Sequence, residues 1–137
     1  MRRLSLLVML VLVAMLVAAP SVGAAPKSPF VGAWTGNDPA PPAGDGSKLL
    51  LNISSGKTVQ ISFVDKYGSV CVHEGAPTVE FNSKLRGTIS GDTLDATFTS
   101  ARCGPVLLDF LVGVGVTYTY DGANDTIDDG SVIYHRH

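Results

Sequence analysis

The sequence predicts an all-β fold, a small antiparallel up-and-down β-barrel of about eight strands, with a β-sandwich as the alternative. Beyond residue 29, most of the chain consists of short segments in which apolar and polar residues alternate. That pattern is typical of strands with one buried and one solvated face. Clusters of Gly, Asp, Asn and Pro separate these segments at intervals of about 8–12 residues. The predicted mature sequence shows no convincing amphipathic-helix pattern, with one short helix over Pro105–Leu111 as an alternative.

Residues 1–24 have the features of a secretory signal peptide, bacterial in style. Two arginines precede the apolar run from Leu4 to Ala19, and the small-residue site Val22-Gly23-Ala24 follows. The run of about 16 residues is shorter than the roughly 20 needed to span a bilayer, although an uncleaved anchor remains the alternative. We expect cleavage after Ala24, a single β-barrel-like domain over residues 25–137, a secreted or extracytoplasmic location and no stable membrane insertion after cleavage.

The charge balance of the predicted mature chain is mildly acidic. Once the two leader arginines are set aside, eight Lys and Arg remain against twelve Asp and Glu, a net charge of −4. A nucleic-acid-binding domain presents a strongly basic face. This balance therefore argues against a nucleic-acid partner, and it leaves the oligomeric state open.

The segment Phe30-Val31-Gly32-Ala33-Trp34-Thr35-Gly36 holds the only tryptophan and predicts the first strand. Phe30, Gly32, Trp34 and Gly36 share one face of such a strand. A tryptophan buries on the order of 200 Å², so Trp34 should hold one end of the core. The two glycines beside it leave room for another segment to lie across the indole.

The motif Phe30-x-Gly32-x-Trp34 resembles the opening motif of the calycin superfamily, which includes lipocalins, fatty-acid-binding proteins and avidins. The match covers five residues of 137. Lipocalins also carry an arginine near the end of the barrel that packs on this tryptophan, and Arg136 is the candidate here. The resemblance implies a closed barrel that binds a small apolar ligand. Avidin-type biotin pockets use several tryptophans and this chain has one, so biotin binding is not implied.

The next segments predict a loop and then a hairpin. Residues 37–47 contain three prolines and have the composition of a loop. Lys48–Ile53 and Thr58–Phe63 both alternate apolar and polar residues, and Ser55-Gly56 supplies a tight connection between them. They predict the clearest hairpin in the chain.

The middle of the chain predicts four further short strands. Turns are expected at Lys66-Tyr67-Gly68 and Gly91-Asp92, and Gly75-Ala76-Pro77 should interrupt the pattern. The four segments are Val70–His73, Thr78–Asn82, Arg86–Gly91 and Thr93–Thr99.

Val106–Val116 is the most apolar segment of the predicted mature chain. Its length and its glycines favour a strand bent near Gly113 or Gly115, with a short helix over Pro105–Leu111 as the alternative. Val114, Val116, Tyr118 and Tyr120 then share one face of the following strand. Two short strands, Thr126–Asp128 and Ser131–His135, complete the pattern.

Cys71 and Cys103 are the only cysteines. An even count in an oxidising compartment favours one disulfide, with two unpaired buried thiols as the alternative. The bond would close a loop of about 33 residues, which is worth roughly 3–4 kcal/mol in the chain-entropy model. An immunoglobulin domain places a tryptophan between its cysteines, so the position of Trp34 argues against that fold.

No pattern for catalysis is present. The sequence lacks Gly-x-Ser-x-Gly, His-Glu-x-x-His and a phosphate-binding glycine loop. His73-Glu74 places an imidazole beside a carboxylate, but neighbouring residues on a strand point to opposite faces. We therefore expect no enzyme, no catalytic residues and no cofactor.

Two polar groups have side chains that can bind metals. His135 and His137 could face one side of a strand and bind zinc or copper, but no third ligand is fixed. The second group comprises Asp121, Asn124, Asp125, Asp128 and Asp129. Its oxygen atoms suit calcium, but its spacing matches no EF-hand loop, and Asp and Asn favour turns in their own right. We expect surface histidines, turn-forming acids and no metal site.

The apolar faces carry the functional prediction. Nine residues on the apolar sides of their strands should face one common interior: Val59, Ile61, Phe63, Val79, Phe81, Leu94, Phe98, Val116 and Tyr118. Phe110 could also line a cavity. A ligand should contact Phe63, Phe81, Phe98, Tyr118 and Tyr120, with the tyrosine hydroxyls as polar handles. We expect a secreted calycin-like binding module for a small apolar ligand. The alternative is a secreted or surface structural or interaction β-domain without an internal ligand.

Overall fold

The computed structural model describes residues 27–39, 45–56 and 58–137, so the predicted leader lies outside the described residues. The helical elements are α2 (Ser69–His73) and the 3-10 turn η1 (Asp109–Leu111). The strands are β1 (Gly32–Asn37), β2 (Lys48–Ile53), β3 (Val59–Asp65), β4 (Phe81–Ser90), β5 (Thr93–Cys103), β6 (Val106–Leu107), β7 (Gly115–Asp121), β8 (Thr126–Asp128) and β9 (Ile133–Arg136). Within these ranges no helix is long and apolar enough to cross a membrane.

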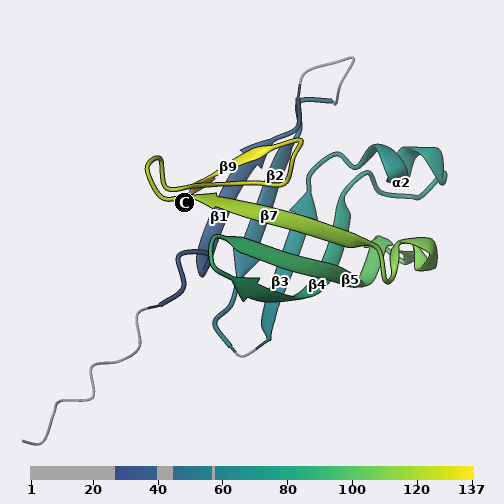
Figure 1. The fold of residues 1–137 in the computed structure, drawn as a ribbon. Helices are drawn as coiled ribbons and strands as arrows, with labels where there is room; N and C mark the ends of the chain where they lie inside the picture. The colour runs from purple at the N-terminus through teal and green to yellow at the C-terminus, as the bar shows by residue number, and fades with distance from the viewer. Residues whose placement is uncertain (1–26, 40–44, 57) are drawn as a thin grey trace, which may run out of the picture.

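Eight of these strands close into an antiparallel barrel (Figure 1). Neighbours in the ring are neighbours in the chain, in the order β1, β2, β3, β4, β5, β7, β8 and β9, and β9 pairs back onto β1. The ninth strand, β6, pairs only with the end of β5. The predicted up-and-down barrel of about eight strands is confirmed, and the sandwich alternative is wrong because the pairing closes.

The predicted hairpin is present as β2 and β3. Leu51 pairs with Phe63, and Ile53 pairs with Ile61. Leu51, Ile53 and Ile61 are each at most 2 % exposed, whereas the intervening polar residues face outward. The alternation read from the sequence therefore corresponds directly to the inner and outer faces of the barrel.

A single strand, β4, replaces the two short strands predicted over Thr78–Asn82 and Arg86–Gly91. Inward-facing residues alternate without a break from Phe81 through Ser83 and Leu85 to Gly87. Two separate strands were expected because serine and glycine interrupt the apolar pattern at two of these inward positions. Val79 precedes β4 and is exposed, so its predicted inward orientation is wrong.

A β-bulge adjusts the pairing of β4 with β5. Lys84 pairs with Ser100 and Leu85 pairs with Phe98, which leaves Thr99 as the extra residue. The Thr99 hydroxyl donates a hydrogen bond to the Lys84 carbonyl oxygen at 3.1 Å. The extra residue shifts the alternation by one position, so Phe98 and Ala101 both pack in the core.

The strand predicted over Val70–His73 is wrong, because these residues form the helix α2. Four residues cannot distinguish strand alternation from one helical turn. Gly75 ends the turn with a φ of +64°. Cys71 is fully buried, and Val72 is exposed.

The single bent strand predicted over Val106–Val116 is also wrong. The segment forms β6, the 3-10 turn η1 and a turn at Gly113, whose φ is +87°, before β7 begins. The helix alternative is thus partly right, over Asp109–Leu111 only. Leu108 is the buried residue of this connection, whereas Phe110 is exposed, so Phe110 lines no interior. Val114 is exposed as well and does not share the inner face with Val116, Tyr118 and Tyr120.

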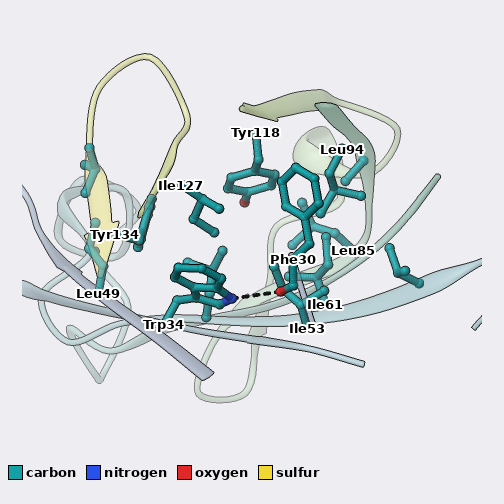
Figure 2. Packing of buried hydrophobic residues seen from close by; sticks show 14 residues of the cluster. Phe30, Trp34, Leu49, Ile53, Ile61, Leu85, Leu94, Tyr118, Ile127 and Tyr134 are labelled. Atoms are coloured by element: carbon teal, nitrogen blue, oxygen red, sulfur yellow. Dashed lines mark hydrogen bonds between the residues drawn. The ribbon is translucent and has the colours of Figure 1, made fainter. Parts of the chain in front are cut away.

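The interior contains two clusters of buried side chains. The larger one fills the barrel around Trp34, Leu85, Leu94 and Ile127 (Figure 2). The smaller one comprises Cys71, Phe81, Ala101, Cys103 and Leu108. Phe63 and Phe98 pack against both clusters, so the two cores are continuous.

The predicted disulfide between Cys71 and Cys103 is confirmed, with 5.5 Å between their Cα atoms. It links α2 to the end of β5 and thereby holds together the two long connections, residues 66–80 and 104–114. Figure 1 shows both connections at the same end of the barrel, which we call the disulfide end.

Replacing both cysteines by alanine should lower the free energy of unfolding by about 3–4 kcal/mol, because the unfolded chain loses its cross-link. The far-UV circular dichroism should persist, since the larger cluster contains neither cysteine. Urea denaturation monitored by circular dichroism measures the change, and the reduced wild-type protein is the control. An unchanged denaturation midpoint would contradict this prediction.

Candidate functional site

Trp34 lies at the end of the barrel opposite the disulfide. Its indole is fully buried, and its Nε1–H donates a hydrogen bond to the Phe30 carbonyl oxygen at 2.8 Å (Figure 2). Phe30 was predicted to lie in the first strand, but it lies in a turn before β1 and is nevertheless fully buried. We call this end of the barrel the Trp34 end.

Arg136, the residue that the family resemblance suggests for this role, covers the indole. Its guanidinium carbon lies 4.1 Å from the centroid of the Trp34 ring, well within the range of a cation–π contact. The two residues are also direct partners in the β1–β9 pair. Arg136 donates hydrogen bonds to the carbonyl oxygens of Pro29 at 2.7 Å and Val31 at 3.1 Å.

Glycines at two positions of β1 make these contacts sterically possible. A Cβ atom on Gly32 would lie 2.9 Å from an Arg136 nitrogen, and Gly32 has a φ of +144°. A Cβ atom on Gly36 would lie 2.7 Å from a Val132 methyl carbon and 2.9 Å from the Tyr134 ring. Gly32 therefore leaves room for Arg136 across the indole, as expected, whereas Gly36 leaves room for Val132 and Tyr134.

Asp125 completes the polar network at the Trp34 end. Its carboxylate accepts hydrogen bonds from Arg136 Nε at 2.8 Å and from the Tyr120 hydroxyl at 3.1 Å. The Arg136 guanidinium holds the pKa of the Asp125 carboxyl below its usual range, and the same pair raises the pKa of Arg136. Burial and the Asp125 carboxylate raise the pKa of Tyr120. The ion pair therefore stays charged and Tyr120 stays protonated at neutral pH.

The five predicted ligand-contacting residues lie in three places. Tyr120 packs beside Phe30 and Trp34, with ring centroids 5.9 and 6.4 Å away, so it belongs to the Trp34 end. Tyr118 is buried in the larger cluster, and its burial, followed by the charge of Asp129, raises its pKa. The two hydroxyls do not converge on one site as polar handles.

Phe63, Phe81 and Phe98 do lie together. The Phe81 ring is 6.0 Å from Phe63 and 6.5 Å from Phe98, in edge-to-face arrangements. This trio bridges the two buried clusters.

Five open hollows on the described residues have volumes between about 280 and 650 Å³. None of the five is lined by the predicted ligand-contacting residues. One hollow, of about 640 Å³, lies between α2 and Phe110 at the disulfide end. The others lie along the outward sides of the strands.

The acidic residues of the last turns satisfy backbone and side-chain donors. Asp121 accepts hydrogen bonds from the Ala123 amide and the Asn124 side chain, and Asp128 accepts one from the Gly130 amide. Among the described residues, no group of three or more His, Cys, Asp or Glu side chains is placed to hold a metal ion. His135 and His137 are both exposed.

Exposed apolar side chains gather at the disulfide end. The described chain exposes eight large apolar residues, and seven of them lie in the two connections there. We call this set the apolar cap: Tyr67, Val72, Val79, Leu107, Phe110, Val112 and Val114. The connections contact each other through the disulfide and around Gly104, where an added Cβ would meet the Thr78 methyl group at 2.7 Å. The sequence pattern does not reveal this surface, because six of these residues fall in segments that read as strands and Tyr67 falls in a predicted turn.

Comparison with known proteins adds no further information on the site, because no family model, curated protein or solved structure matches this chain.

Replacing Trp34 by alanine should lower the free energy of unfolding by about 3–5 kcal/mol, since it removes the largest buried side chain and a cation–π partner. Chemical denaturation followed by circular dichroism measures the loss. The Trp34→Phe variant is the matched control, and it should lose less because an aromatic ring remains beneath Arg136. Equal midpoints for wild type and Trp34→Ala would contradict the prediction.

Proposed function

We propose that this chain is a secreted, extracytoplasmic interaction module that binds a partner protein through the apolar cap. The observation that carries this proposal is the gathering of seven of eight exposed large apolar residues at one end of the barrel. Exposed apolar residues scattered singly are normal on a protein surface, whereas a concentrated patch is typical of an interface.

The chemistry around the apolar cap favours a protein partner over an anionic membrane. His73 and Glu74 border the hollow beside Phe110, and Asp109 and the Lys66–Glu80 ion pair lie nearby. Counted with Arg102, which pairs with Leu107, the rim carries three carboxylates against two permanent cations, and this balance disfavours anionic lipid headgroups. An apolar centre within a polar rim is the usual arrangement of a protein interface. The partner should therefore present an apolar anchor beside basic residues.

The disulfide makes such a surface rigid. Cys71 and Cys103 are fully buried and tie α2 to β5, directly beneath the apolar cap. A surface that is already ordered loses little conformational entropy on binding. The barrel would then act as a stable support, with recognition concentrated in its two long connections.

A photoreactive phenylalanine analogue at position 110 should form a discrete cross-linked product in the producing cells, because Phe110 is 60 % exposed within the apolar cap. The same analogue at Ile133 is the control, since Ile133 is also exposed but lies outside the cap. With the purified partner, Phe110→Ser should weaken binding about thirtyfold, as expected for an interface hot spot of about 2 kcal/mol.

Ile133→Ser should leave the affinity for that partner unchanged. Identical cross-linked products from positions 110 and 133, or no product at position 110, would contradict the interaction proposal.

A second candidate is the calycin-like carrier of a small apolar ligand. The stacking of Arg136 on Trp34 supports a calycin-like relationship, because it matches the arginine expected from the resemblance. The Ser83 hydroxyl also supports it, since this oxygen is buried between Phe63 and Ala101 on neighbouring strands and has no hydrogen-bond partner. A ligand would have to displace part of the Phe63–Phe81–Phe98 trio to reach it.

If the carrier proposal is right, an environment-sensitive fatty acid should bind saturably to the disulfide-intact protein with a dissociation constant below about 100 µM, near −5.5 kcal/mol. Fluorescence of the dye and of Trp34 would report binding. Phe81→Ala should alter the affinity, whereas Phe110→Ser should not. Absence of saturable binding, together with no retained lipid in native mass spectrometry, would remove this candidate.

A further inference from the structure

Three cations lie on the outward side of the barrel wall formed by β4 and β5. Lys84 and Arg86 are alternate residues of β4, so both point away from the core and both are exposed. Arg102 is exposed on β5 and pairs with Asn82, which is two positions from Lys84 on β4. We call Lys84, Arg86 and Arg102 the cationic row.

The geometry of the strands fixes the spacing of the row. Alternate residues of a strand lie about 7 Å apart, so the three cations follow β4 over roughly 13 Å. Strand backbones hold their Cα atoms in place, and the row is therefore organised before any ligand arrives.

Among the described residues, none of these cations forms an ion pair with a carboxylate. The ion pairs of the described residues are Lys66–Glu80 and Arg136–Asp125, and neither involves the cationic row. Asp95 lines the same hollow as Arg86, and its carboxylate accepts a hydrogen bond from the Thr117 hydroxyl at 2.7 Å. The Glu80 carboxylate accepts hydrogen bonds from Lys66 and from the Asn82 side chain. The acids that influence one another, Asp38, Asp45, Asp65 and Asp129, lie in turns and strand ends outside this wall. A locally positive face therefore persists on a mildly acidic protein.

Three hollows adjoin the row. Two of them, of about 350 and 280 Å³, adjoin each other at Ser62 and Lys84. The third, of about 650 Å³, begins at Arg86 and extends over β5 and β7. Their remaining walls are mainly hydroxyl and amide side chains, including Gln60, Asn82 and Ser100.

We propose that the cationic row binds an acidic polysaccharide laid along β4. The cations would pair with successive carboxylates of the polymer, and the neighbouring hydroxyl and amide groups would hydrogen-bond its sugar hydroxyls. None of the described residues that line the three hollows is aromatic. Single-stranded nucleic acids rely on aromatic side chains for base stacking, so a polyuronate fits this wall better than a nucleic acid. The row meets the apolar cap at one point, where Arg102 pairs with Leu107 and both line the smallest hollow, whereas Lys84 and Arg86 lie away from the cap.

The test is a titration of the mature, disulfide-intact protein with polygalacturonate, followed by calorimetry at low and at raised salt. Dextran serves as the neutral polysaccharide and a single-stranded oligonucleotide as the competing polyanion. Polygalacturonate should bind, raised salt should weaken it, and dextran should not bind.

The decisive comparison uses two double variants that remove the same charge. Lys84→Gln with Arg86→Gln should weaken polygalacturonate binding about tenfold, the sum expected for two exposed charge contacts. Lys27→Gln with Lys48→Gln should leave it unchanged, and Trp34 fluorescence confirms that both variants fold. The proposal is overturned if the wild type does not bind, if both variants weaken binding equally, or if the oligonucleotide binds more tightly than the polysaccharide.

Discussion

Closure of the barrel depends on the contact between Arg136 and Trp34. The pairing of β1 with β9 comprises only two residue pairs, Trp34 with Arg136 and Thr35 with His135. One further backbone hydrogen bond, from the His137 amide to the Ala33 carbonyl oxygen at 2.9 Å, extends this short ladder. The Arg136 side chain adds a cation–π contact, bonds to two carbonyl oxygens of the segment before β1 and an ion pair with Asp125. One side chain thus joins three separate segments of the chain.

The two ends of the barrel are stabilised in different ways. At the Trp34 end, short turns and one buried indole leave little exposed apolar surface. At the disulfide end, two long connections are held by a covalent bond and a small core around Cys71 and Leu108. Because the cross-link stabilises these connections, their apolar side chains need not be buried to keep them folded. Phe110 and Leu107 can therefore remain exposed.

The sequence predicts those parts of the fold that follow from local alternation or from rare residues. The β2–β3 hairpin and the disulfide belong to this group, whereas the place of Arg136 over Trp34 follows only from the resemblance to calycins. Prediction from the sequence fails where tertiary contacts override a short pattern. The α2 residues were expected to form a strand, because four residues cannot distinguish a helical from a strand period. Phe110 was expected to be buried, but Leu108 takes the inward position instead. The apolar cap therefore could not be predicted, since its exposure depends on η1 and on the disulfide.

The β1–β9 seam also bears on how the protein folds. Its partners are about 100 residues apart in the chain, and contacts of such separation carry a large loop-closure entropy and slow folding. Pairing between sequential strands can form earlier, which leaves a curved but open sheet with β1 and β9 as unpaired edges. Such edges are templates for association with other chains. The risk of aggregation is therefore greatest before the seam closes, and closure removes both edges in a single step.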